Sequence, residues 1–135
     1  MKKVIVGGVL AGLVMVVVGF IVGGMTAEMY RMSPAALWKP MGGNWFLQMV
    51  VYDIVVGLIL SFVYSILKSA VPGSGLQKGI IFGLLVWLVG TLPGMGITYL
   101  TMNVRNLMLT VWALNGLANY VLSGMVINWS DDKLK

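Results

Sequence analysis

Four long runs of apolar residues alternate with short polar segments along the chain. The runs cover residues 4–24, 45–67, 79–100 and 107–129. About 20 helical residues, each rising about 1.5 Å, are enough to cross the roughly 30 Å hydrocarbon core of a bilayer. The pattern therefore predicts an all-α membrane protein, with four transmembrane helices in one domain over residues 1–135.

The composition agrees with a lipid environment. The chain of 135 residues is 59% hydrophobic and 10% charged, and its mean hydropathy is +0.96. A soluble domain carries about 25% charged residues. Because a chain this apolar cannot cover a surface that faces water, lipid must be the solvent for most of it.

The residue types that are absent limit the chemistry. The chain contains no Cys and no His, which removes thiol chemistry and the commonest ligands of zinc, non-haem iron and haem. No phosphate-binding loop, dinucleotide fingerprint or nucleophile elbow is present. We therefore expect no catalytic residues, no enzyme activity, no metal and no cofactor.

The first run has a basic start that resembles a signal peptide. Lys2 and Lys3 precede it, but an apolar stretch of about 20 residues exceeds the 7–15 of a signal core. We interpret it as a retained transmembrane helix.

The basic residues predict an orientation. The formal charge is +5, which in this setting indicates headgroup contact and topology, with no nucleic-acid partner. Six basic residues flank the runs on the side of the two termini: Lys2, Lys3, Lys68, Lys78, Lys133 and Lys135. Three lie on the other side: Arg31, Lys39 and Arg105. The excess predicts a multi-pass protein of the inner (plasma) membrane with both termini in the cytoplasm.

The connectors and one proline refine this plan. Residues 68–78 form a tight, Gly- and Pro-containing connector, so the second and third helices are expected to be antiparallel neighbours. Pro93 lies inside the third run and predicts a kink, because proline lacks an N–H and clashes with the preceding turn. Glu28 and Arg31 are spaced to pair on a short helical turn in the longer connector 25–44.

Glycine spacing suggests an internal repeat and a glycine zipper. Two sets of four glycines step by 4, 7 and 4 residues: Gly8, Gly12, Gly19 and Gly23 in the first run, and Gly79, Gly83, Gly90 and Gly94 in the third. The second run has Asp53, Gly57 and Ser61 at steps of four, and the fourth has Asn115, Asn119 and Ser123. The chain is thus expected to be two related hairpins, whose glycines allow close helix packing within the chain or between chains.

Asp53 is the residue most suggestive of function. It lies about eight positions into the second run, which is about 12 Å deep along a helix. An ionised carboxylate at such a depth costs about 2.5–3.5 kcal/mol, so it requires a proton, a partner or water. Two readings stand: a polar clamp with Asn115 or Asn119, and a proton or cation site in a pathway. Gln48 and Tyr52 are the nearest polar residues on the connector side.

Methionines gather near the same end as the long connector. Met25, Met29 and Met32 are spaced i, i+4, i+7, and thioethers suit Cu(I). Methionine is also a common filler of irregular apolar surfaces. We therefore predict packing and no copper binding.

A resemblance supports the architecture alone. The stretch from Lys78 to Gly83, with Pro93-Gly94 and Leu114-Asn115-Gly116, is similar to small four-helix bacterial membrane proteins of uncharacterised function. The leading hypothesis is a protein that acts by association, as an accessory subunit of a membrane complex or a homo-oligomer. The alternative is a conduit or carrier for protons, cations or a small solute, centred on Asp53.

Overall fold

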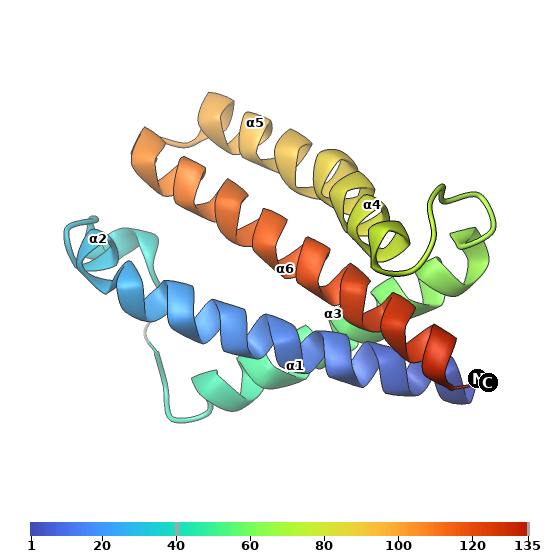
Figure 1. Ribbon diagram of the computed structural model, residues 1–135. Helices are drawn as coiled ribbons and strands as arrows, with labels where there is room; N and C mark the ends of the chain where they lie inside the picture. Colours follow the sequence, from blue (N-terminus) through green and yellow to red (C-terminus); the bar gives the residue numbers. More distant parts are fainter. Residues whose placement is uncertain (40, 135) are drawn as a thin grey trace.

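The structure is a computed structural model that describes residues 1–39 and 41–134 (Figure 1). Four helical spans are long and apolar enough to cross a membrane: Lys2–Met25, Trp45–Leu67, Leu76–Thr101 and Asn106–Lys133. The described residues contain no strand. The chain thus has the four-helix membrane form expected from its apolar runs. Lys135, which entered the charge count, lies outside the described residues.

The spans pack in the order α3, α1, α6, α4, so α3 and α4 are not the extended neighbours that their short connector predicted. Helix α1 (Lys2–Met25) packs against both α3 (Trp45–Leu67) and α6 (Asn106–Lys133), and α6 also packs against α4 (Leu76–Val86). Helices α3 and α6 have much less contact with each other. The two central helices are therefore α1 and α6, and each carries one outer helix.

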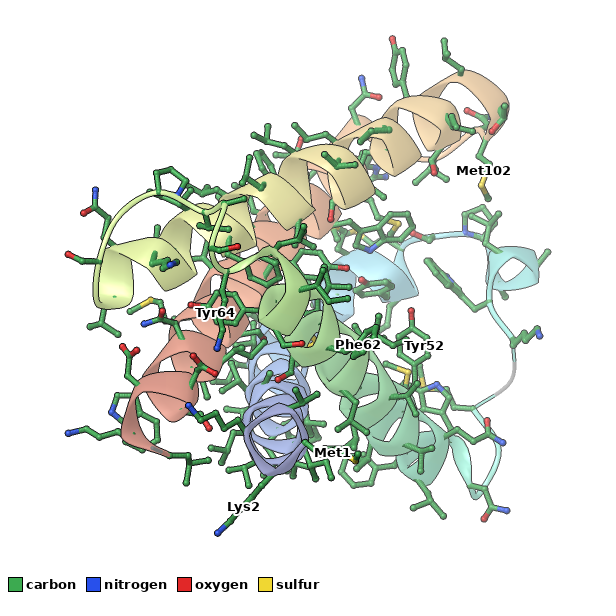
Figure 2. All side chains as sticks on the ribbon, turned by 90° about the vertical axis from the view of Figure 1, so that its right-hand side faces the viewer. Met1, Lys2, Tyr52, Phe62, Tyr64 and Met102 are labelled. Carbon is green, nitrogen blue, oxygen red and sulfur yellow. The ribbon has the colours of Figure 1, made fainter. Side chains whose placement is uncertain are left out.

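Both chain termini lie at one end of the molecule, which we call the terminal end (Figure 1). The opposite end, called the connector end, carries the segments that join α1 to α3 and α5 to α6. Near the terminal end the aromatic rings of Tyr64 and Phe82 meet edge to face, with centroids 5.1 Å apart. Toward the connector end α3 and α5 (Leu92–Thr101) diverge, and they make no extended contact (Figure 2).

The third span changes its helical pitch where the kink was expected. A π-helical turn, η2 (Trp87–Thr91), separates α4 from α5, and Pro93 stands in the first turn of α5. Because proline cannot donate a hydrogen bond to the preceding turn, a widened turn just before it accommodates the missing bond.

The connector between α1 and α3 is folded onto the bundle. It contains α2 (Ala27–Arg31) and a 3-10 turn, η1 (Ala35–Leu37). The indole Nε1 of Trp112 on α6 donates to the Tyr30 hydroxyl at 2.7 Å, and the ring of Trp38 packs edge-on against both aromatic rings. Arg31 and Glu28 pair at 2.7 Å, as their spacing predicted, in an exposed position.

The buried core is small and lies toward the terminal half. Its members come from all four spans and, in the case of Val71, from the connector between α3 and α4: Ala11, Met15, Leu60, Tyr64, Val71, Phe82 and Ile127. Most other large apolar side chains are exposed, including Val89 at 77% and Leu100 at 80%. Such exposure is expected of a protein whose outer surface meets lipid.

Candidate functional site

Asp53 lies in α3, about two turns from its start at Trp45. Its side chain is partly buried. Among the residues that the structure describes, it forms no ion pair and no hydrogen bond. Its backbone carbonyl faces Gly12 of α1. The carboxyl group therefore reaches hydrocarbon depth without a polar partner from the described chain.

The predicted contact between Asp53 and the asparagines of α6 is not formed. The Asn119 side-chain nitrogen instead donates to the backbone oxygen of Asn115 at 3.0 Å and to its side-chain oxygen at 3.1 Å. Matching depth was the basis of the prediction, but depth does not fix which helices are neighbours. Helix α1 packs against both α3 and α6 and holds their middle turns apart.

Three of the polar residues expected near Asp53 are either exposed or have an unpaired side-chain atom. The side-chain oxygen of Asn119 is buried and has no hydrogen-bond partner. Tyr52 is 64% exposed, and Gln48 is exposed at a shallow pocket of about 370 Å³ that Lys39 and Trp45 also line. The four polar positions expected near Asp53 are thus not gathered around its carboxylate.

Glycines bring α1 and α3 into direct backbone contact. A Cβ atom added to Gly57 would lie 2.5 Å from the Gly12 nitrogen, and one added to Gly12 would lie 2.6 Å from the Ile54 Cα. A Cβ on Gly8 would lie 2.7 Å from the Leu58 Cα. Such distances are below any ordinary carbon contact, so only glycine fits this crossing.

A second crossing joins α4 to α6 in the same way. A Cβ on Gly79 would lie 2.5 Å from the Gly124 oxygen, and one on Gly83 would lie 2.6 Å from the Val121 Cα. The sequence did not predict a role for Gly124, because the spacing of the polar residues indicated Asn115 and Asn119 as the contact positions of this helix. It occupies the position against α4 that Gly57 occupies against α1.

The other four glycines of the two stripes lie outside intrachain contacts. No heavy atom lies within 4 Å of a Cβ built on Gly19, Gly23, Gly90 or Gly94. Their predicted role in packing within the chain is therefore corrected. Close approach at the terminal half makes the helices cross at an angle, so they separate toward the connector end, where these glycines lie.

A polar network at the terminal end was missed. The Lys68 ammonium group pairs with Asp131 at 2.8 Å, and Lys3 donates to the Asp131 backbone oxygen at 3.0 Å. The Tyr64 hydroxyl donates to the side-chain oxygen of Asn128. The Asn128 nitrogen donates to the Gly75 oxygen at 3.0 Å. These bonds join α1, α3, the α3–α4 connector and α6.

The signal for this network was present in the sequence. The fourth apolar run predicts a helix that ends at residue 129, but α6 continues to Lys133. Buried positions Ser123, Ile127 and Ser130 keep helical spacing across that boundary. Following this period would have placed Asp131 on the same helix as Asn128, which the run to residue 129 already includes.

The methionines do not share one surface. Met29 is buried at 8% exposure under the connector, whereas Met25 and Met32 are 82% and 64% exposed. Met108 of α6 is also buried. The burial of Met29 and Met108 agrees with a packing role, for which methionine's adaptable shape is suited.

The sequence matches no protein-family model, no curated protein and no solved structure. The four apolar helices agree with the form of the small membrane proteins that the chain resembles. The arrangement offers a carboxyl group that can accept hydrogen bonds or carry a proton, on the half of α3 that α1 contacts but α5 does not.

Proposed function

We propose that this protein acts by association within the membrane, as an accessory subunit of a membrane complex or as a homo-oligomer, and that it is not an enzyme. The contact surface would be the connector-end half of α3, residues 45–56. The observation that carries the proposal is Asp53, a carboxyl group at hydrocarbon depth with no polar partner among the described residues.

An energetic argument connects this observation to a partner. Leaving an ionised carboxylate at the centre of a bilayer costs about 2.5–3.5 kcal/mol. A donor on a neighbouring chain would remove most of this cost, and interhelical hydrogen bonds in membranes contribute about 0.6–2 kcal/mol each. The association would thus satisfy Asp53 and select the partner at the same time.

The surroundings of Asp53 support this reading. Helix α3 has no extended contact with α5 (Figure 2), and Leu47 and Val51 of its connector-end half are 63% and 54% exposed, so they can meet another helix. Gly90 and Gly94 of the third span have open space beside them. Bare glycine backbone permits close approach of a further helix, which is the main source of contact energy between helices in lipid.

A second candidate is a conduit or carrier for protons, cations or a small solute. The same unpartnered Asp53 favours it, because intramembrane carboxyl groups often serve as proton or cation sites. Toward the terminal end, however, the interior is filled by Leu60, Tyr64 and Phe82, which are at most 8% exposed. A continuous polar route from Asp53 would require these side chains to move, and this makes association the preferred function.

We further propose that the two hairpins are copies of one unit, and that a glycine zipper joins the two helices of each copy. The matched contacts of Gly57 with Gly8 and of Gly124 with Gly79 support this. With this pairing Gly57 of α3 corresponds to Gly124 of α6. The spacing of the polar residues in the sequence instead paired Gly57 with Asn119, which lies five positions earlier. We also propose an inner-membrane location with both termini in the cytoplasm, because the terminal end carries most of the lysines.

The intact mass of the complex tests the proposed function. The protein is extracted from its native membrane in a mild detergent, and its mass is compared among wild type, Asp53→Asn and Asp53→Leu. We expect a mass above one chain for wild type and Asp53→Asn, because an amide keeps hydrogen bonding, and a single chain for Asp53→Leu.

Phe62→Leu provides the matched control. Phe62 is 57% exposed and lies nine residues from Asp53, which places it on the opposite side of α3. This variant should assemble as wild type does. A wild-type protein that is a single chain under these conditions would overturn the proposal. Assembly that survives Asp53→Leu would show that Asp53 is not the contact.

A further inference from the structure

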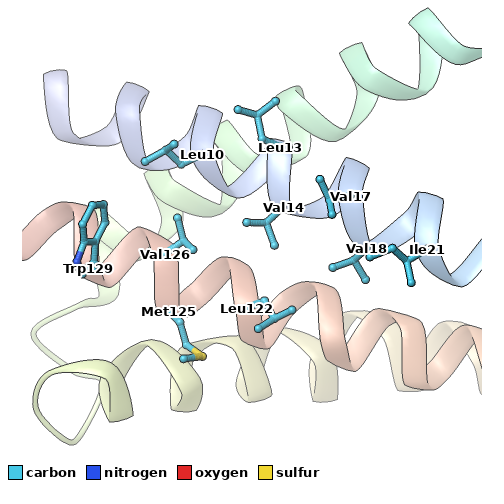
Figure 3. A pocket seen from close by; sticks show the side chains of 10 residues that line it. All are labelled: Leu10, Leu13, Val14, Val17, Val18, Ile21, Leu122, Met125, Val126 and Trp129. Atoms are coloured by element: carbon cyan, nitrogen blue, oxygen red, sulfur yellow. The ribbon is translucent and has the colours of Figure 1, made fainter.

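An apolar groove runs between α1 and α6 on the face opposite α3 and α4 (Figure 3). It has a volume of about 700 Å³. Its walls are aliphatic side chains of α1 and α6, among them Leu10, Leu13, Val14, Leu122 and Val126. Trp129 closes the wall at the terminal end and is 50% exposed. This groove is separate from the half of α3 that carries Asp53.

The terminal end of the groove is basic. Lys2 lies eleven residues, or about three helical turns, before Leu13, so the two residues share a face of α1. Its side chain points away from the bundle (Figure 2). Lys133 lies one turn beyond Trp129 on α6 and is exposed. Asp131 is already shared between Lys3 and Lys68.

Five described lysines of this end, Lys2, Lys3, Lys68, Lys78 and Lys133, stand against two carboxylates, Asp131 and Asp132, so the charge is not balanced within the described chain. Lys2 and Lys133 form no ion pair there. Trp129 between them is suited to the headgroup level, because its ring is apolar and its N–H can meet a polar group. An apolar channel with a cationic mouth is complementary to a molecule that has a hydrocarbon chain and an anionic head.

We propose that this groove binds an anionic phospholipid. One acyl chain would lie along α1 and α6, and the phosphate would lie between Lys2 and Lys133. The span from Lys2 to Leu13 is about 17 Å along the helix, which matches one leaflet of the roughly 30 Å hydrocarbon core. The lengths thus agree with a lipid of the leaflet that faces the terminal end.

A second copy of the chain fits this groove less well. A copy inserted in the same direction would bring together two ends that each carry more lysines than carboxylates, and like charges repel. A lipid phosphate instead supplies the missing negative charge. The lipid is therefore the occupant that the charges favour.

Lipid retention measured by native mass spectrometry tests this proposal. The purified full chain is mixed with phosphatidylglycerol or phosphatidylcholine that carry identical acyl chains. We expect phosphatidylglycerol to bind more tightly. Because a basic residue near an anionic headgroup is worth about a fivefold change in affinity, Lys2→Gln with Lys133→Gln should weaken phosphatidylglycerol about 25-fold and phosphatidylcholine little.

Two matched variants separate the site from general effects. Lys78→Gln removes a lysine of the same end that lies on α4, away from the groove, and should leave binding unchanged. Leu13→Trp should fill the groove and weaken both lipids, whereas Ile59→Trp, on the exposed side of α3, should not. Equal affinity for the two lipids, equal effects of Lys78→Gln and the double change, or a dimer with no bound lipid would each overturn the proposal.

Discussion

The crossing of α1 and α3 gives the sharpest prediction about stability. In Gly57→Ala the new methyl carbon would lie 2.5 Å from the Gly12 nitrogen. An ordinary contact is about 3.5 Å, so the helices must separate by about 1 Å along a crossing that Gly8 and Gly12 also line. Overpacking of this kind costs about 1–3 kcal/mol. We expect the free energy of unfolding to fall by that amount.

Gly19→Ala is the matched control, because no heavy atom lies within 4 Å of its new methyl group. Both changes gain the same helix propensity, of up to about 1 kcal/mol, so their difference isolates the crossing. The assay is reversible unfolding of the purified protein in mixed micelles, followed by circular dichroism. Gly124→Ala should behave like Gly57→Ala. Equal stability of Gly57→Ala and Gly19→Ala would refute the reasoning.

Three further predictions concern the terminal end. Tyr64→Phe should lower the free energy of unfolding by about 1–3 kcal/mol, because the buried Asn128 oxygen loses its donor; Tyr99→Phe, at 61% exposure, should not change it in the same unfolding assay. Asp131→Asn should cost about 1 kcal/mol, because the Lys68 side chain is 40% exposed and water screens the pair in part, and the loss should shrink in high salt; a loss that salt does not alter would contradict an ionic origin. A reporter fused after the C-terminus should show the cytoplasmic phenotype, and an extracytoplasmic signal would reverse the proposed topology.

The four spans could be predicted because hydropathy depends on composition alone. Each span must satisfy its backbone internally and expose apolar side chains to lipid, and a run of about 20 apolar residues is sufficient evidence of both. The ends were harder to predict. Hydropathy fades after Trp129, although α6 continues to Lys133 on polar residues that bond to its neighbours.

The neighbours of Asp53 could not be predicted for a different reason. Sequence gives the depth of a residue and its face on its own helix, but it does not give the order in which helices pack. Asp53 and Asn115 were expected at the same depth, yet α1 packs between their helices. Spacing alone also could not separate Gly12, which lies in a backbone contact, from Gly19, which belongs to the same stripe and contacts no other helix.

Site-specific photo-crosslinking in the native membrane tests the central claim, association through the Asp53 side of α3, most directly. A photoreactive amino acid is placed at Met49, one turn from Asp53 on the same face and 42% exposed, or at Phe62 on the opposite face. We expect an adduct with another membrane protein chain, or with a second copy, from position 49 and none from position 62. Protein adducts from neither position, or equally from both, would contradict it.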